Sequence, residues 1–159
     1  MKSLFQTVVV AVSGSEASIN ASKFGILMTK LYRTRLIAVY VVDTATLKEL
    51  LLSKIFVEDE SLEYEKSLED NGHRYLNYIE ELAEKKGVGV EKVLRRGAVF
   101  SEIIQAAEDN DADLILLGGW EAKGKSDVLS RQHREILINA KCSILVVKEP
   151  DIDFLYRKL

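Results

Sequence analysis

Four short runs of Val, Ile and Leu, separated by polar and helix-forming segments, limit this chain to few folds. The runs cover residues 7–12, 36–42, 114–117 and 143–147, and their apolar residues are continuous rather than alternating with polar ones. Continuous apolar runs of this length are typical of parallel strands that are buried on both faces of a sheet. A fifth segment, residues 88–94, alternates more and is predicted to be an edge strand.

Between the predicted strands, apolar residues recur with the spacing of an α-helix. This periodicity predicts helices over residues 16–32, 64–86, 100–109 and 134–140. Because strands and helices alternate along the chain, we expect one domain over residues 1–159: a three-layer, doubly wound α/β fold around a five-stranded parallel sheet.

The connection over residues 44–60 is longer than usual and unusually apolar. We expect it to pack on the domain as a short helix near the crevice at the carboxyl end of the sheet. A lid over that crevice and a partner-binding surface are the alternatives, since functional segments favour this face. Its apolar residues are Leu47, Leu50, Leu51, Leu52, Ile55 and Phe56.

Composition excludes several functional classes. The net charge is −3, so nothing indicates a general binder of nucleic acid or of an anionic membrane. No apolar run approaches membrane-spanning length, and we expect a cytoplasmic protein. Cys142 lies in an apolar run and is predicted to be a small core residue. Neither His73 nor His133 has a second histidine or cysteine at metal-ligand spacing, so we assign no metal site, and no catalytic residue is recognisable.

Two turns from a strand into a helix carry the candidate chemistry. The first is Val12-Ser13-Gly14-Ser15, and the second runs from Gly118-Gly119 through a polar loop to Ser130-Arg131-Gln132. Glycine lets the backbone approach a ligand, and a helix N-terminus offers free N–H groups to an anion. Ser15 is predicted to be a helix N-cap. An anion site and a purely structural turn therefore both remain open.

Five segments follow one another along the chain: Val10-Ala-Val-Ser13-Gly14-Ser15-Glu16, Ala38-Val-Tyr-Val-Val-Asp43, Arg96-Gly97, Ala112-Asp113-Leu-Ile-Leu-Leu-Gly118 and Ala140-Lys-Cys-Ser-Ile-Leu-Val-Val147. Through these segments, in this order, the chain resembles the universal stress protein family over residues 7–148. The resemblance implies the adenine nucleotide alpha hydrolase-like fold, with five parallel strands in the order 3-2-1-4-5, and a homodimer. We expect the homodimer to form through the last strand, which offers an edge to a second subunit.

Many members of that family bind ATP through an aspartate after the first strand, a valine after the second, and G-x2-G-x9-G-[ST] after the fourth. Ser13 stands where the family has the aspartate that meets adenine or ribose, and Val41 stands at the valine. Gly118 matches the first glycine, the second falls on Glu121, and the closing pair falls on Ser130-Arg131 in a loop about one residue shorter.

These matches and departures imply weak, altered or absent binding of ATP or AMP. A side chain in place of glycine hinders close backbone approach, and the carboxylate of Glu121 repels a triphosphate. The residues that the resemblance assigns to such a site, with their sequence neighbours, are Val12, Ser13, Gly14, Ser15, Val41, Gly118, Gly119, Ser130, Arg131 and Gln132.

Two functional hypotheses follow. In the first, the chain is a dimeric regulatory stress-response protein that acts through an unknown protein partner, with reduced or absent nucleotide binding. In the second, it is an adenine-nucleotide sensor or slow ATPase with a remodelled loop, in which Lys123, Lys125 and Arg131 supply positive charge. Residues 12–18 also faintly resemble the Ser-Gly-Gly-x-Asp-Ser loop of ATP pyrophosphatases, with Ser15 and Ala17 replacing its second glycine and its aspartate.

Overall fold

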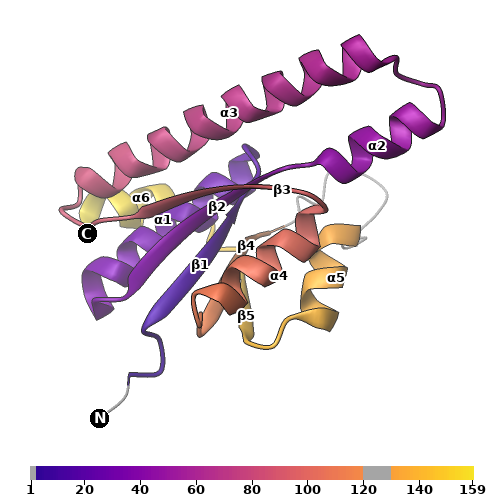
Figure 1. The fold of residues 1–159 in the computed structure, drawn as a ribbon. Coiled ribbons are helices and arrows are strands. Elements are labelled where there is room, and N and C mark those ends of the chain that lie inside the picture. Colours follow the sequence, from indigo (N-terminus) through magenta and orange to yellow (C-terminus); the bar gives the residue numbers. More distant parts are fainter. Residues whose placement is uncertain (1–2, 120–129) are drawn as a thin grey trace.

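In residues 3–119 and 130–159, which the computed structural model describes, five strands form one parallel sheet (Figure 1). Its strand order is β3-β2-β1-β4-β5, which confirms the predicted order 3-2-1-4-5 and the α/β fold class. The strands in chain order are β1 (Thr7–Val12), β2 (Arg35–Val42), β3 (Glu91–Arg96), β4 (Leu114–Gly118) and β5 (Ser143–Val147).

Helices cover both faces of the sheet because both faces of its central strands are apolar. Val8 and Val10 of β1 pack in a core that also contains residues of α1 (Glu16–Tyr32) and α3 (Glu58–Glu84). Val9 points the other way, into a core shared with α4 (Val99–Asp109) and α5 (Arg131–Asn139). This alternation is the period of two expected of a strand, and it produces the three layers.

Some element boundaries differ from the predicted ones. The edge strand pairs from Glu91 rather than residue 88, because Val88 and Val90 pack against the core before the ladder with β2 begins. The long helix starts at Glu58 instead of residue 64, and the acidic residues of its first turn suit the positive end of a helix dipole. The last predicted helix starts at Arg131 instead of residue 134, directly after its N-cap Ser130.

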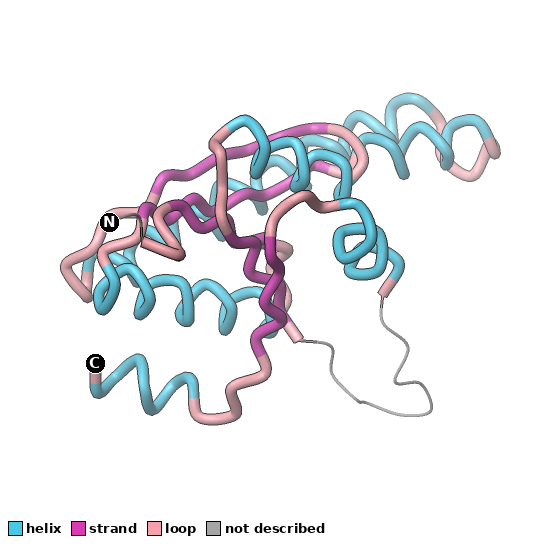
Figure 2. The backbone as a smooth tube through the Cα atoms, turned by 90° about the horizontal axis from the view of Figure 1, so that it is seen from below, coloured by secondary structure: helices cyan, strands magenta, loops and turns pink. Residues whose placement is uncertain are grey.

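A C-terminal helix, α6 (Ile152–Lys158), was not predicted, because seven residues are too few for a clear periodicity. It lies beside α1 (Figure 2). The Nζ atom of Lys23 on α1 is 2.6 Å from an Asp153 carboxylate oxygen, and the Tyr156 hydroxyl donates to the Leu82 carbonyl at 2.7 Å. These contacts tie the end of the chain to α1 and α3.

The apolar connection over residues 44–60 contains α2 (Thr44–Leu52) and the start of α3. Asp43 caps α2 by accepting from the Thr46 N–H at 3.0 Å. Leu47 is buried, whereas Leu52 and Ile55 are 76% and 65% exposed, so only part of this apolar surface is covered within the chain. Figure 1 shows α2 and the adjoining part of α3 extending beyond the sheet. Among the described residues, no helix is both long enough and apolar enough to cross a bilayer.

Candidate functional site

A pocket of about 240 Å³ lies at the carboxyl ends of β1 and β4, beside the first turns of α1 and α5. The strand order reverses between these two strands, and α/β sheets bind ligands at such a switch point. Seven of the predicted site residues line the pocket: Val12, Ser13, Ser15, Gly118, Gly119, Ser130 and Gln132. Apolar residues of α4 and α5, Val99, Ile103 and Ile136, also line it, beside His133.

Three predicted site residues do not line this pocket. Val41 is buried in the core between the sheet and α4. Gly14 has φ +81°, and a Cβ there would meet the Tyr75 ring at 2.3 Å, so it serves the turn into α1. Arg131 is exposed in the first turn of α5. No residue of the 44–60 connection lines the pocket either.

The α1 side of the pocket is a closed network of serines. The Ser15 hydroxyl accepts from the Ser18 N–H at 3.1 Å, as predicted for an N-cap. The Ser18 hydroxyl donates to the Ser15 carbonyl at 3.0 Å and accepts from the Ser13 N–H at 3.1 Å. The Ser13 and Ser15 hydroxyls are 3.0 Å apart. Ser13 therefore presents a hydroxyl where the family pattern has a carboxylate.

The α5 side contains a histidine that the sequence did not single out for the site. Ser130 caps the helix by accepting from the His133 N–H at 3.2 Å. The imidazole of His133 folds back over this cap, with Nδ1 2.5 Å from the Ser130 hydroxyl and Nε2 2.7 Å from the Gly118 carbonyl oxygen. The sequence shows a histidine three residues after a capping serine, but it does not show that the ring contacts Gly118 at the end of β4.

The paired glycines at the end of β4 are required by close packing within the chain itself. A Cβ on Gly118 would lie 2.6 Å from the carbonyl carbon of Ala17, in the first turn of α1. A Cβ on Gly119 would lie 2.8 Å from the Val147 carbonyl oxygen. Both obstacles are backbone atoms that a side chain cannot push aside, so the two glycines need no ligand to explain them.

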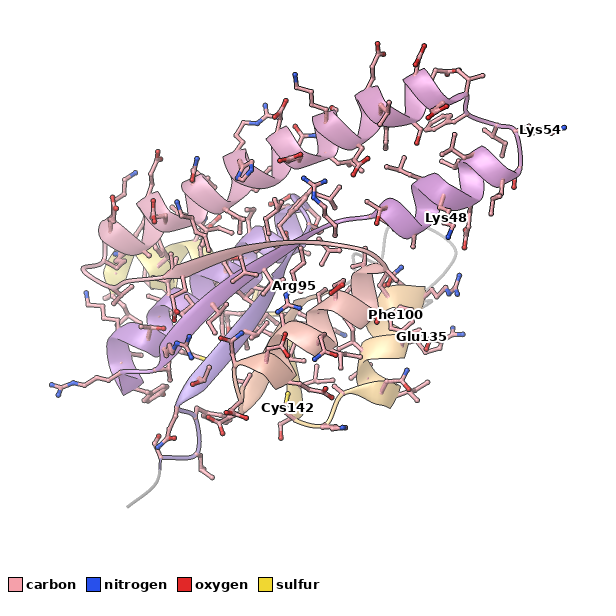
Figure 3. The ribbon with its side chains drawn as sticks, in the orientation of Figure 1. Lys48, Lys54, Arg95, Phe100, Glu135 and Cys142 are labelled. Atoms are coloured by element: carbon pink, nitrogen blue, oxygen red, sulfur yellow. The ribbon has the colours of Figure 1, made fainter. Side chains whose placement is uncertain are left out.

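Gln132 connects the two helices that border the pocket. Its Oε1 atom accepts from the Phe100 N–H at 3.0 Å, so α5 satisfies a free N–H in the first turn of α4. Figure 3 shows Phe100 at the start of α4, next to α5. The carboxamide is thereby occupied with holding α4, although Gln132 also lines the pocket.

A larger hollow of about 320 Å³ lies at the other end of the strands. It is lined in part by Cys142, which Figure 3 labels near the start of β5. Its lining includes Glu108, Asp111 and Lys141, which are surface residues of the connections before β4 and β5 and of α4. Burial raises the pKa of the Cys142 thiol, which keeps it protonated and unreactive near neutral pH. Cys142 is half-buried against the core, and this hollow gathers none of the predicted site residues.

Part of the predicted loop chemistry falls on residues that the structure does not describe. Glu121, which replaces a family glycine, and the basic Lys123 and Lys125 lie outside the described residues. The same holds for Trp120, Gly124 and Ser126 of the same loop.

Comparison with solved structures places the fold among universal stress proteins. The universal stress protein UspA of Lactobacillus plantarum superposes with a TM-score of 0.74 at 17% identity, covering 92% of this chain and 100% of that one. A universal stress protein of Arabidopsis thaliana with AMP bound gives 0.65 at 16% identity, covering 92% and 94%. Other structures with this fold are a universal stress protein in complex with cAMP and one of Archaeoglobus fulgidus in complex with dAMP, with TM-scores of 0.64 and 0.58 and identities of 19% and 16%. They cover 91% and 92% of this chain and 98% and 100% of theirs.

Sequence comparison identifies the family. The universal stress protein MJ0531 of Methanocaldococcus jannaschii is 30% identical over 150 residues, which cover 94% of this chain and 85% of that protein. The sequence profile of the universal stress protein family matches residues 4–148, nearly the whole length. The chain therefore belongs to the universal stress protein family.

Proposed function

We propose that the chain is a regulatory stress-response protein that binds an adenine nucleotide weakly, in an altered form of the family's site. The observation that carries this proposal is the pocket at the β1–β4 switch point, lined by residues from the first turns of both α1 and α5. Helix N-termini attract phosphate groups. Neighbours whose structures contain AMP, cAMP and dAMP support the choice of an adenosine monophosphate as ligand.

Three features of the pocket favour weak binding over tight ATP binding. Its volume of about 240 Å³ is below the roughly 300–1,000 Å³ typical of small-molecule sites. Ser13 offers a neutral hydroxyl in place of a carboxylate, so a ribose hydroxyl gains a weaker, uncharged acceptor. The backbone beside Gly118 and Gly119 already packs against the chain itself, which leaves less room for a triphosphate.

Thermal denaturation with added nucleotide tests the proposal. AMP at about 100 times its dissociation constant stabilises a protein by about 2.7 kcal/mol, an easily measured rise in melting temperature. We expect millimolar AMP to raise the melting temperature. Adenosine and inorganic phosphate, each added alone, probe the two ends of the ligand separately. No shift with AMP, cAMP or ATP at 10 mM, together with no adenine nucleotide released from the denatured protein, would refute nucleotide binding.

Arg131 and Arg134 form a matched pair for mapping the phosphate end. Both are exposed on α5, but Arg131 stands in its first turn beside the cap Ser130. We expect Arg131→Ala to weaken AMP binding several-fold without changing stability, and Arg134→Ala to change neither.

A substitution at Ser13 is expected to strengthen binding instead of weakening it. Ser13→Asp restores the family's carboxylate, and we expect this variant to bind the nucleoside part of the ligand more strongly.

We also propose that two copies of the chain pair through β5. This strand bonds to β4 on one side and forms an edge of the sheet, and its central residues are only half-buried. An exposed strand edge is a template for another strand, and a two-fold axis pairs identical edges antiparallel. Light scattering at tens of micromolar protein measures the mass directly, and a monomer at that concentration would contradict this pairing.

A further inference from the structure

We propose that His133 controls phosphate binding in this pocket by taking up one proton when an anion binds at Ser130. The inference rests on the proposed nucleotide function and adds to it a recognition residue and a dependence on pH. The carrying observation is the chain of hydrogen bonds that runs from the Gly118 carbonyl through the His133 ring to the Ser130 hydroxyl.

The partners of the imidazole determine where its proton lies in the neutral form. The Gly118 carbonyl oxygen can only accept, so Nε2, 2.7 Å away, must carry the proton. A neutral imidazole has one N–H, so Nδ1 is unprotonated and accepts from the Ser130 hydroxyl at 2.5 Å. The Ser130 proton is then directed at His133, and the oxygen presents lone pairs to any incoming anion.

Protonation of Nδ1 reverses the direction of this bond. The imidazolium donates through Nε2 to Gly118 and through Nδ1 to the Ser130 oxygen, which also accepts from the His133 N–H. The Ser130 hydroxyl proton is released and becomes free to donate to a phosphate oxygen. One proton therefore changes the capping hydroxyl from an acceptor into a donor and places a positive charge beside the anion.

Within the described part of the chain, His133 is the pocket residue that can take up this proton. The described residues that line the pocket include no other ionisable side chain. Glu102, on the facing helix α4, is 3.6 Å from Arg95, which partly compensates its charge. Further charged residues on the bordering elements also lie outside the lining: Glu16, Lys23 and Lys30 on α1, Glu108 and Asp109 on α4, Arg131, Arg134 and Glu135 on α5, and Lys148 after β5.

The helix N-terminus couples the proton to the anion. Its positive end opposes a cation at His133 while the pocket is empty, and a bound anion reverses that balance. Imidazole is the side chain that changes charge between pH 5 and 8, so the coupling acts near neutral pH. By linkage, uptake of a whole proton strengthens anion binding by up to about tenfold for each pH unit of acidification.

Titration calorimetry with AMP tests this coupling. AMP is titrated at pH 6.5, 7.5 and 8.5 in buffers of different ionisation enthalpy, which reports the protons taken up per nucleotide bound. From pH 8.5 to 6.5 we expect affinity to rise about tenfold more in the wild type than in His133→Gln, because the variant retains only the ligand's own titration. Inorganic sulfate, a dianion throughout, checks the result with a ligand that does not titrate.

A second measurement uses the unmodified protein and so does not depend on how the variant folds. The chain has two histidines, and His73 on α3 is an exposed internal reference. Saturating AMP is expected to raise the NMR titration midpoint of the His133 ring by about one pH unit and to leave that of His73 unchanged.

The outcomes separate the inference from the proposed function. AMP binding with equal pH dependence in wild type and His133→Gln, or an unmoved His133 midpoint at saturating AMP, overturns the inference and leaves the nucleotide function standing. No AMP binding by the wild type anywhere between pH 5.5 and 8.5 overturns both.

Discussion

The pocket has a serine-capped helix on each side, and the two caps differ in what they hold. Ser15 at the start of α1 bonds to the Ser18 N–H and contacts the Ser13 hydroxyl, so its partners cannot change charge near neutral pH. Ser130 at the start of α5 makes the same kind of backbone bond but also contacts the imidazole of His133. One cap is a fixed structural element, and the other contains a titratable group.

Gly118 contacts both the α1 side and the α5 side of the pocket, so substitutions around it test how the two sides differ. Its Cα packs on the first turn of α1, and its carbonyl accepts from His133 of α5. The α1 contact depends on the absence of a side chain, whereas the α5 contact depends on one specific side chain. We therefore expect substitutions at the Ser15 cap and at the α1 contact of Gly118 to act mainly on stability, and those on the α5 side to act on pH response and ligand binding as well.

The largest effect is expected from Gly118→Ala. The new methyl group would lie 2.6 Å from a backbone carbon of Ala17, so β4 and α1 must separate. Overpacking of this kind costs about 3 kcal/mol of unfolding free energy, measured by urea denaturation. Gly89→Ala is the control, because a Cβ there has no described neighbour within 4 Å. Equal stability of the two variants would show that α1 does not press on Gly118.

His133→Ala is expected to have the next largest effect on stability. It removes the donor to the buried Gly118 carbonyl, and an unsatisfied buried acceptor costs about 1–2 kcal/mol. Urea denaturation at pH 8 isolates this loss from any protonation of the ring. His73→Ala serves as the comparison, since His73 is 59% exposed and its loss should barely matter. An unchanged midpoint for His133→Ala would indicate that water replaces the imidazole.

Ser15→Ala and Ser130→Ala compare the two caps directly. Loss of a serine N-cap costs about 1 kcal/mol of unfolding free energy, and we expect this loss in both variants. For Ser15→Ala the loss of unfolding free energy should be equal at pH 6 and pH 8. This variant should also retain the pH dependence of AMP binding. Ser130→Ala should lose most of that pH dependence, because the donor that protonation releases is gone. Identical behaviour of the two variants in AMP titrations would remove the distinction between the caps.

Much of the fold could be predicted because its signals are local. The run over residues 7–12 and the helical stripe over 16–32 match β1 and α1 residue for residue, since continuous apolar runs and a 3.6-residue period reflect burial directly. The start of α3 at Glu58 was missed because its exposed first turns carry no apolar stripe onto the sheet. The helix α6 is held by Lys23 and Leu82, which are distant in sequence.

The candidate site was less predictable because its contacts join distant residues. The two glycines suggested a phosphate loop, but their requirement comes from Ala17 and Val147, which only the folded chain brings near. His133 was considered only as a metal ligand and was not assigned to the pocket, because its partner Gly118 is fifteen residues away. Val41, assigned through the family pattern, lies in the core instead of the pocket lining.

The smallest effect is expected at Arg96, and it separates acid unfolding from the pH response of the α5 cap. The hydrogen bond from Arg96, 2.6 Å from Glu69, holds the pKa of that carboxyl below its ordinary value of 4.5. A carboxylate with a lowered pKa stabilises the folded state above pH 4.5, and this stabilisation is lost as the pH falls through the folded value.

Arg96→Gln should therefore lower the urea midpoint slightly at pH 7 and leave it nearly unchanged at pH 2.5, where both proteins have lost the pair. The effect is small because both side chains are partly exposed to water. Lys66→Gln removes an exposed positive charge from α3, the helix that carries Glu69, and controls for net charge. Since Glu69 titrates below pH 4.5 and imidazole between pH 5 and 8, Arg96→Gln should retain the full pH dependence of AMP binding. A change in that dependence would mean that the α3–β3 ion pairs, and not the α5 cap alone, control the pocket.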